Sequence, residues 1–191
     1  MVGNKLKDAC QQDGVNAAYM VDESSPMGAC ACCILDKEHS LVTTLSAANN
    51  YKFAHLNEAA KVATLEKAKV VYSASFFMTV CPEAMEVASK QCNKAGQTYG
   101  LKLSAPLLMK VSPFKAVLNR TMPYVDFLVG NETEALTYAK TENWSETDIP
   151  SITKKVAALP KEGDKPRTVR FHMVLTPRLC ASNGEITEQP V

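Results

Sequence analysis

The sequence lacks the two glycine-rich patterns that most often mark nucleotide binding, G-x-x-x-x-G-K-[ST] and G-x-G-x-x-G. Its apolar runs, such as Phe76 to Val80, are far shorter than the roughly 20 residues that span a bilayer. Because 21 Lys and Arg residues balance 20 Asp and Glu residues, no strong charge field attracts nucleic acid or an anionic membrane. We therefore expect neither nucleic acid nor a membrane as a partner.

Cysteine is present, but not in the pattern of a disulfide framework or a zinc site. The seven cysteines are odd in number, and Cys30, Cys32 and Cys33 have no second C-x-x-C pair or Cys/His partner at zinc spacing. We expect reduced thiols, with these three packed in the core of a strand. Residues 1–8 contain no apolar signal core. Together these features predict a cytoplasmic protein, with the nucleus as the alternative location.

The first 50 residues show the pattern of a short helix followed by strands. We predict a helix over residues 6–12, a strand over 15–21, and a β-hairpin whose strands, 29–35 and 40–45, flank the charged turn 36–38. These residues thus form strands ahead of the main body of the chain.

The main body alternates between helical and strand patterns. Strands are predicted over residues 69–74, 98–104, 124–129 and 168–175, and helices over 55–67, 82–96 and 107–118, with another helix beginning at Asn131. The segment over 148–159 is given no type. Such alternation predicts right-handed crossovers and a parallel sheet with helices on both faces. The expected fold is an α/β three-layer sandwich with a mainly parallel central sheet, in one domain over residues 1–191.

Ligands of parallel sheets bind beyond the carboxyl ends of the strands, so residues there are the first candidates for a site. Asn131 and Glu134 follow one predicted strand and share a face of the next helix, whose amino end favours phosphate. An amide and a carboxylate there could hold water around Mg²⁺, which uses few protein carboxylates. The alternative is an ordinary capping box. Phe76 and Phe77 could stack a purine or simply be core residues.

Several segments, in order and at matching spacing, resemble the adenosine kinases of the ribokinase-like family. They cover nearly the whole chain and include Leu45–Asn49, Leu103–Pro106, Met122–Asp126 and Gly130–Ala135. The resemblance implies an ATP- and Mg²⁺-dependent transfer of phosphate to the 5′-hydroxyl of adenosine, in purine salvage. It assigns residues 15–50 to a lid and Asn131 and Glu134 to phosphate and metal. The residues that it assigns to substrate binding are Leu41, Thr43, Leu45, Phe76, Phe77 and Leu107.

The chain departs from that family at several positions. His39 stands where the family has an arginine that neutralises the transferring phosphate, Lys102 replaces an asparagine, and Leu107 replaces an aromatic residue of the adenine pocket. The family's amino-terminal Gly-Gly turn and its Asp-Thr-Asn-Gly-Ala-Gly-Asp element, with the general-base aspartate, are not found in the sequence. We therefore expect an internal part of an adenosine kinase, with no catalytic residue assigned.

Two other hypotheses remain open: a nucleoside-binding remnant without activity, and an α/β scaffold domain. The sequence predicts a monomer if the chain is complete and self-association if it is truncated, since truncation exposes sheet surface.

Overall fold

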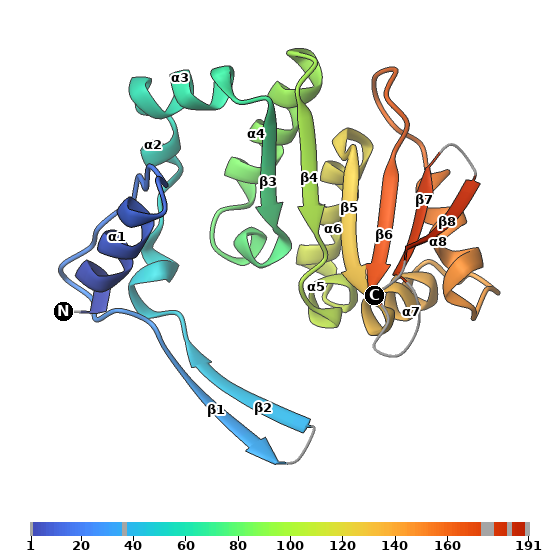
Figure 1. Cartoon of the computed structure of the whole chain (residues 1–191), viewed down its shortest axis with the longest axis horizontal. Coiled ribbons are helices and arrows are strands. Elements are labelled where there is room, and N and C mark those ends of the chain that lie inside the picture. Colours follow the sequence, from blue (N-terminus) through green and yellow to red (C-terminus); the bar gives the residue numbers. More distant parts are fainter. Residues whose placement is uncertain (1, 36–37, 173–177, 183–184, 190–191) are drawn as a thin grey trace. The chain divides into compact units, whose positions relative to one another are not determined.

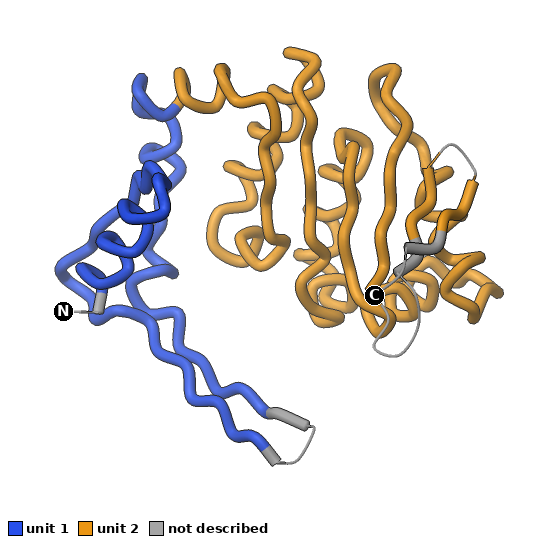
Figure 2. Tube along the Cα trace, viewed as in Figure 1, with its two compact units in different colours: residues 1–61 blue, residues 62–191 orange. Residues whose placement is uncertain are grey.

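The computed structural model describes residues 2–35, 38–172, 178–182 and 185–189, although the side chains at residues 2, 35, 38–39, 178–179 and 188–189 are outside the description. The chain divides into two compact units, residues 1–61 and residues 62–191 (Figure 2). Each unit is described by itself. No helix among the described residues is long and apolar enough to cross a membrane.

Unit 1 contains a helix, a two-stranded hairpin and short helical turns. Cys30 of one strand faces Thr43 of the other, and Cys32 faces Leu41, in an antiparallel ladder. The predicted hairpin is thus confirmed by its described strands. The elements are α1 (Val2–Gln12), β1 (Ala29–Leu35), β2 (Glu38–Thr44), η1 (Ser46–Asn50), α2 (Phe53–Leu56) and α3 (Ala59–Lys67), the last of which continues into unit 2.

The predicted strand over residues 15–21 is wrong. These residues pair with no strand among those described, and Val15 and Val21 are 54% and 62% exposed. Asp22 instead organises the turn that follows, since its carboxylate accepts hydrogen bonds from the Ser24 hydroxyl and the Asn50 amide, both at 2.6 Å. An apolar alternation without a neighbouring strand does not form a sheet.

The expectation that Cys30, Cys32 and Cys33 pack in a core is also wrong, because all three side chains are exposed. In the part of unit 1 that the structure describes, β1 pairs only with β2 and no second layer covers either face. Two strands alone cannot enclose a core. Nor do the described residues include a group of three or more His, Cys, Asp or Glu side chains that could hold a metal ion.

Unit 2 is built on a six-stranded sheet in the order β3-β4-β5-β6-β7-β8 (Figure 1). The first four strands are parallel and the last two are antiparallel. The α/β fold class with a mainly parallel central sheet is therefore confirmed. The strands are β3 (Val70–Ala74), β4 (Thr98–Lys102), β5 (Phe127–Asn131), β6 (Thr168–His172), β7 (Arg178–Ser182) and β8 (Glu185–Gln189).

The helices of unit 2 agree with most of the predicted ones. The predicted helix over 107–118 is divided at Val111, because Pro113 has no amide hydrogen for the first helix and begins the second. Strands β7 and β8 were not predicted. The helical elements are η2 (Ser75–Thr79), α4 (Pro82–Lys94), α5 (Pro106–Lys110), α6 (Ser112–Thr121), η3 (Met122–Tyr124), α7 (Glu132–Thr141) and α8 (Ile149–Ala157).

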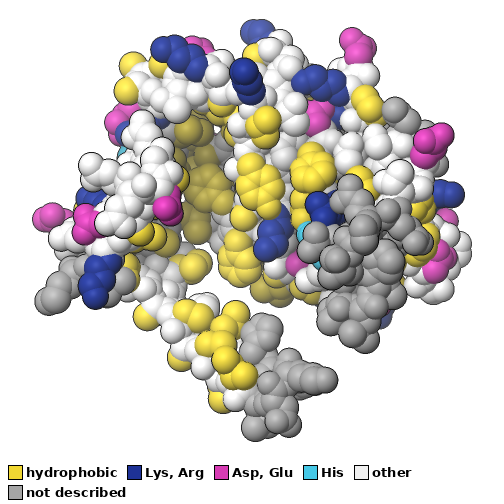
Figure 3. Space-filling view, viewed as in Figure 1, with side chains coloured by type: hydrophobic (Ala, Val, Ile, Leu, Met, Phe, Trp, Pro, Cys, Tyr) yellow, Lys and Arg dark blue, Asp and Glu magenta, His cyan; other side chains and the backbone are white. Residues whose placement is uncertain are grey.

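The described helices of unit 2 cover one face of the sheet rather than the two expected. Successive strands β3 to β6 are neighbours in one direction, so right-handed crossovers carry every connecting helix to the same side. Figure 1 shows α4, α6, α7 and α8 behind the sheet. Side chains on that face are buried, whereas Val70 and Tyr72 on the other face are 63% and 56% exposed. Hydrophobic side chains accordingly gather over β3 and β4 in Figure 3.

The register of the central strands is reinforced by Asp126, which directly precedes β5. Its carboxylate accepts a hydrogen bond from the Tyr99 backbone amide at 2.8 Å and pairs with the Lys161 ammonium at 2.8 Å. Both side chains of the ion pair are only 9% exposed. Because a buried carboxylate needs such partners, this contact fixes β4 against β5 and aligns the ends of both strands.

Candidate functional site

A cavity of about 330 Å³ opens at the carboxyl ends of the parallel strands in unit 2. Parallel strands end at the same edge of a sheet, so polar residues that are distant in the sequence meet there. This is the edge at which the sequence predicts a site. The residues that line the cavity are Tyr72, Lys102, Val129, Gly130, Asn131, Glu134 and His172.

Asn131 and Glu134 lie together at the junction of β5 and α7. The Glu134 amide donates a hydrogen bond to Asn131 Oδ1 at 2.8 Å, and the Asn131 amide donates to Glu134 Oε2 at 3.0 Å. Asn131 Nδ2 also lies 3.3 Å from Glu134 Oε1. The pair therefore forms a complete capping box, which is the alternative that the sequence left open. A capping role does not remove the two side chains from the cavity that they line.

Gly130 allows the Glu134 carboxylate to fold back under the strand end. A Cβ atom at this position would stand 2.9 Å from the Phe171 ring and 3.0 Å from Glu134 Oε2. Since such contacts are closer than carbon atoms normally approach, any larger residue here would displace the carboxylate. The glycine at the carboxyl end of β5 is thus part of how this site is built.

The environment of the Glu134 carboxylate disfavours its negative charge. The residue is 2% exposed, and burial raises its pKa above the ordinary value, while the Asn131 backbone amide and the Lys102 ammonium act in the opposite direction. A buried carboxylate of this kind gains stability from a nearby cation. The site therefore favours positive charge, either from the protein or from a bound ion.

Lys102 supplies one such positive charge at the last position of β4. Its side chain is exposed, and its ammonium makes no hydrogen bond or ion pair with any residue that the structure describes. His172, the last residue of β6, lies directly across from Asn131 in the ladder and also lines the cavity. Both residues line the cavity at the strand ends.

The structure unites only part of the predicted site. Phe76 and Phe77 lie in η2, where Phe76 is 45% exposed and Phe77 packs against the hydrophobic core. Leu107 is the second residue of α5 and is 55% exposed. None of these three lines the cavity that contains Asn131 and Glu134.

The predicted lid residues belong to unit 1. Leu41 and Thr43 share one face of β2, whereas Leu45 lies just beyond the strand in a helical conformation, so the expected common strand face includes only the first two. The side chain of His39 lies outside the described residues.

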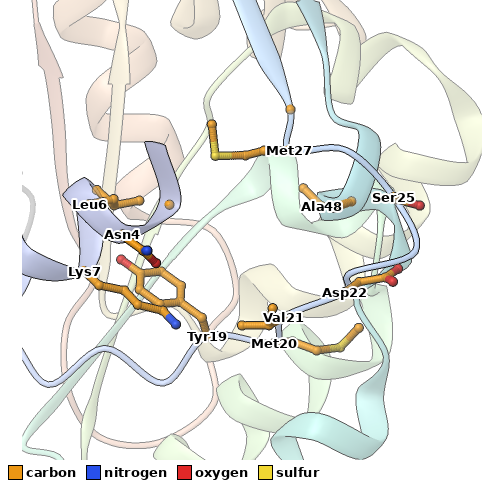
Figure 4. Close-up of a pocket in the computed structure, with 13 residues that line it drawn as sticks. Asn4, Leu6, Lys7, Tyr19, Met20, Val21, Asp22, Ser25, Met27 and Ala48 are labelled. Carbon is orange, nitrogen blue, oxygen red and sulfur yellow. The ribbon is translucent and has the colours of Figure 1, made fainter. Parts of the chain in front are cut away.

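Unit 1 contains a larger cavity, of about 470 Å³. Figure 4 shows Leu6 and Lys7 of α1 beside Tyr19, with Met27 on another segment that lines the cavity. Leu6, Tyr19 and Met27 are among the exposed large hydrophobic residues. We favour the smaller cavity in unit 2 as the functional site, because it joins convergent polar groups at the ends of parallel strands.

Tyr72, His172 and Gly130 were not predicted as site residues. The signal that could have found Tyr72 and His172 is the period of two along each strand, because Tyr72 shares its sheet face with Lys102, Val129 and His172. To use that signal, the last residue of each strand must be predicted to within one residue. The sequence predicts that the strand of His172 ends at residue 175, and residues 173–175 lie outside the described part of the chain.

The mainly parallel sheet defines an α/β protein whose candidate ligand site lies beyond the carboxyl ends of the strands. Residues 1–170 match the family described as pfkB family carbohydrate kinase, and the chain belongs to that family.

Several curated proteins that the chain resembles are named adenosine kinases. Adenosine kinase 2 of Arabidopsis thaliana is 38% identical over 190 residues, which cover 99% of this chain and 54% of the relative. Adenosine kinase of Dictyostelium discoideum is 37% identical over 184 residues, covering 96% of this chain and 53% of the relative. The chain thus spans about half the length of the curated relatives it matches.

Solved structures of similar proteins agree with this assignment. The crystal structure of Anopheles gambiae adenosine kinase in complex with a di(adenosine-5) tetraphosphate superimposes with a TM-score of 0.94 at 34% identity, and the match covers 99% of this chain and 57% of that chain. Apo adenosine kinase of Trypanosoma brucei brucei gives a TM-score of 0.90 at 29% identity, covering 99% and 57%. The ribokinase-like architecture expected from the sequence is thereby confirmed.

Proposed function

We propose that this chain forms the nucleotide-binding core of an adenosine kinase, which transfers the γ-phosphoryl group of ATP to the 5′-hydroxyl of adenosine in purine salvage. The observation that carries the proposal is the cavity at the strand ends, with Asn131 and Glu134 at the amino end of α7, in a chain whose relatives are named adenosine kinases. Phosphoryl transfer requires positioning and charge neutralisation more than covalent chemistry from the protein. The carboxyl edge of this sheet offers groups that can position phosphates and neutralise their charge.

In this proposal the amino end of α7 and the Lys102 ammonium attract the phosphates to the strand ends. The helix end contributes backbone N–H groups and a partial positive charge. Asn131 and Glu134 hold the end of the helix in one geometry through their reciprocal hydrogen bonds. The hairpin of β1 and β2 acts as the lid that excludes water from the nucleoside, with Leu41 and Thr43 as its adenine-facing residues. Phe77 of unit 2 is a further proposed substrate-binding residue.

The residues of the cavity fit Mg²⁺ only through water. Each Glu134 oxygen accepts a hydrogen bond from Asn131 but keeps further lone pairs, and no group of three or more metal-ligating side chains occurs among the described residues. Magnesium uses few protein carboxylates and keeps several waters. Glu134 would therefore hold the ion through its water shell, and Mg²⁺, when bound, supplies neutralisation of the phosphate charge.

A coupled assay for AMP formation from adenosine and Mg-ATP tests the proposal. We expect turnover that falls at least about tenfold in Glu134→Gln, since the lost charge no longer orders a metal-bound water. Glu132→Gln is the matched control, because Glu132 is exposed in the same first turn of α7 and does not line the cavity. Equal activity of the two variants would contradict the role of Glu134.

A nucleotide-binding domain without turnover is the second candidate function. It is favoured by the burial of Glu134 and by its existing hydrogen bonds, which leave it poorly placed to accept a proton from substrate. Calorimetry with adenosine and with ATP separates the two candidates. Saturable heat without AMP formation supports binding alone, whereas absence of both heat and product would reject either function for this chain.

A further inference from the structure

Residues 18–26 of unit 1, which we call the strap, run in the opposite direction alongside a later stretch of the same unit. At one end the Pro26 carbonyl oxygen accepts a hydrogen bond from the Ala47 amide at 3.1 Å. At the other end the Ala18 carbonyl oxygen lies 3.1 Å from Nε2 of His55. The strap is therefore held against η1 at its last residue and against α2 at its first.

The middle of the strap is held by polar side chains and one sulfur atom. The Asn50 side-chain amide donates hydrogen bonds to Asp22 Oδ2 at 2.6 Å and to Ser25 Oγ at 3.0 Å. The Lys52 backbone amide donates to the Met20 sulfur at 3.3 Å. The hydroxyl of the serine two residues after Asp22, and then the Asn50 amide, lower the pKa of the Asp22 carboxyl below its ordinary value. These middle contacts therefore keep their protonation states between pH 5 and 8.

His55 differs from these groups, because histidine is the side chain that ordinarily changes charge between pH 5 and 8. Its Nδ1 lies 3.2 Å from Glu58 Oε1, and only 12% of the side chain is exposed. Both partners of the ring, the Ala18 carbonyl and the Glu58 carboxylate, are acceptors. A neutral imidazole has one N–H and one lone pair, so it donates to only one of them. The doubly protonated ring donates to both.

The charged groups that face His55 hold their own charge while the ring titrates. The hydrogen bond from the Lys61 ammonium is the main cause that lowers the pKa of Glu58, and His55 is a smaller one. Glu58 is thus ionised between pH 5 and 8, and Lys61 is positively charged there. Lys61 opposes a second cation beside Glu58, whereas the Ala18 carbonyl favours it. The Tyr51 ring packs edge-on to the imidazole, with the ring centroids 5.5 Å apart.

We propose that His55 is a pH-dependent clasp, whose protonation ties the first residues of the strap to α2 and whose deprotonation releases them. When the ring loses a proton, one of its nitrogens presents a lone pair to an acceptor oxygen, and that hydrogen bond is lost. An ionised carboxylate is the stronger acceptor, so the neutral ring keeps its contact with Glu58 and gives up the Ala18 carbonyl. The middle contacts of the strap stay in place.

The strap forms part of the wall of the larger cavity of unit 1, so the clasp acts on that cavity. The wall is held at its first residues below about pH 6 and is loosened above about pH 7.5. The strap also leads into β1, and any effect on the lid rests on the proposed function, whereas the clasp itself does not. Figure 4 shows the strap side chains that line the cavity, among them Tyr19, Met20, Val21 and Asp22.

Chymotrypsin cleavage of the full chain after Tyr19 tests the clasp, because cleavage requires the strap to leave its neighbours. Each variant is compared with the wild type at the same pH, so the pH dependence of the protease cancels in the ratio of rates. His55→Asn places an amide where Nδ1 lies and cannot reach the Ala18 carbonyl. We expect it to be cleaved about tenfold faster than the wild type at about pH 6, as for the loss of one charge-assisted hydrogen bond. At about pH 8.5 the two rates should be equal within twofold.

His55→Gln is the companion variant, since its longer side chain places an amide near Nε2 and donates to the Ala18 carbonyl without titrating. It should be cleaved at about the wild-type rate at about pH 6 and more slowly than the wild type at about pH 8.5. His172→Asn is the matched control, because it removes a histidine of unit 2, at the end of β6. Its cleavage rate after Tyr19 should stay within twofold of the wild type at both pH values.

A purely structural role of His55 predicts a different result. The ratio of cleavage rates for His55→Asn would then be the same at both pH values, and this outcome would overturn the clasp. Carbon-13 NMR gives a second test, because the Ala18 carbonyl resonance should shift at the same pH midpoint as the His55 ring nitrogens. A carbonyl resonance that does not follow the ring would also reject the proposal.

The outcome for the kinase function is separate. Cleavage that depends on pH through His55, without AMP formation by any variant, upholds the clasp while the proposed activity fails. AMP formation at an equal rate in His55→Asn and the wild type, at both pH values, rejects only the effect on the lid.

Discussion

Units 1 and 2 differ in how much of their side-chain surface is removed from water. No described side chain of residues 1–61 is buried, whereas unit 2 encloses a continuous core that includes Tyr99, Leu128 and Phe171 at 0% exposure. Since buried apolar surface contributes roughly 25 cal/mol per Å², the stability of the described chain resides in unit 2.

The difference indicates which functional groups are held rigidly. Asn131 and Lys102 end strands that a packed core fixes, and Glu134 lies in the first turn of the helix that follows, whereas the predicted lid residues Leu41 and Thr43 lie on a hairpin with no core of its own. Catalytic and binding groups need a rigid support to keep their geometry, and lids need freedom to open. The division of labour proposed for the two units agrees with their packing.

The substitution expected to change the stability of unit 2 most is at Arg167, a charged residue that is only 2% exposed. Its guanidinium donates hydrogen bonds to five backbone carbonyl oxygens, at 2.7 to 3.2 Å. Arg167→Met leaves these acceptors without a donor, so we expect a loss of about 4 kcal/mol in the free energy of unfolding. Urea denaturation measures it. The acceptors belong to Met122, Val125, Val156, Leu159 and Pro160.

Arg167→Lys is the informative companion variant. Lysine keeps the positive charge but has three donors on one nitrogen and cannot reach acceptors in several directions. It should restore at most about half of the lost stability. Full restoration would mean that the charge, acting on groups such as Asp126, matters more than the hydrogen-bond geometry.

The next largest expected effect comes from two matched substitutions, one in each unit. Ile152 in α8 is 0% exposed, and Val42 in β2 is 74% exposed. We expect Ile152→Ala to lower the free energy of unfolding by about 3 kcal/mol through lost apolar contacts and a cavity, and Val42→Ala to change it by less than about 0.5 kcal/mol. Chemical denaturation of both variants measures the difference. A large effect of Val42→Ala would break the comparison, since it would reveal burial of β2 in solution.

Much of the fold could be predicted from the sequence because local signals in unit 2 agree with one another. Pro82 at the start of α4 and the Asn131 capping box at the start of α7 are such signals. Prediction failed at residues 15–21, where an apolar alternation lacks a pairing partner, and for β7 and β8, which follow a segment without a clear pattern. Strand pairing is a long-range property that alternation alone does not encode.

The site was predictable only where a local motif marked it. Asn131 and Glu134 are three residues apart and could be found from spacing, and the structure brings them together in one cavity. Tyr72 and His172 lie on strands far apart in the sequence, so their meeting depends on register across three ladders. It stays a prediction that the residues expected to face adenine belong to the same site as these cavity residues.

The smallest expected effect concerns the pH dependence of unit 2. Burial raises the pKa of Glu134 in the folded state above its ordinary value of 4.5. The folded protein therefore binds this proton more tightly than the unfolded chain does, and the associated stability is present below the unfolded pKa and is lost as pH rises through the folded pKa. We expect the urea midpoint of Glu134→Gln to fall less than that of the wild type as pH increases from 4 upward.

Glu132→Gln separates this effect from a general change in charge. Glu132 is exposed in the same helical turn, so its replacement removes one negative charge and leaves the environment of the buried carboxyl intact. Its pH profile should run parallel to that of the wild type. If instead both glutamine variants show the same weakened dependence of the urea midpoint on pH, the electrostatic field at the amino end of α7 causes that dependence. Desolvation of Glu134 would then not be its cause.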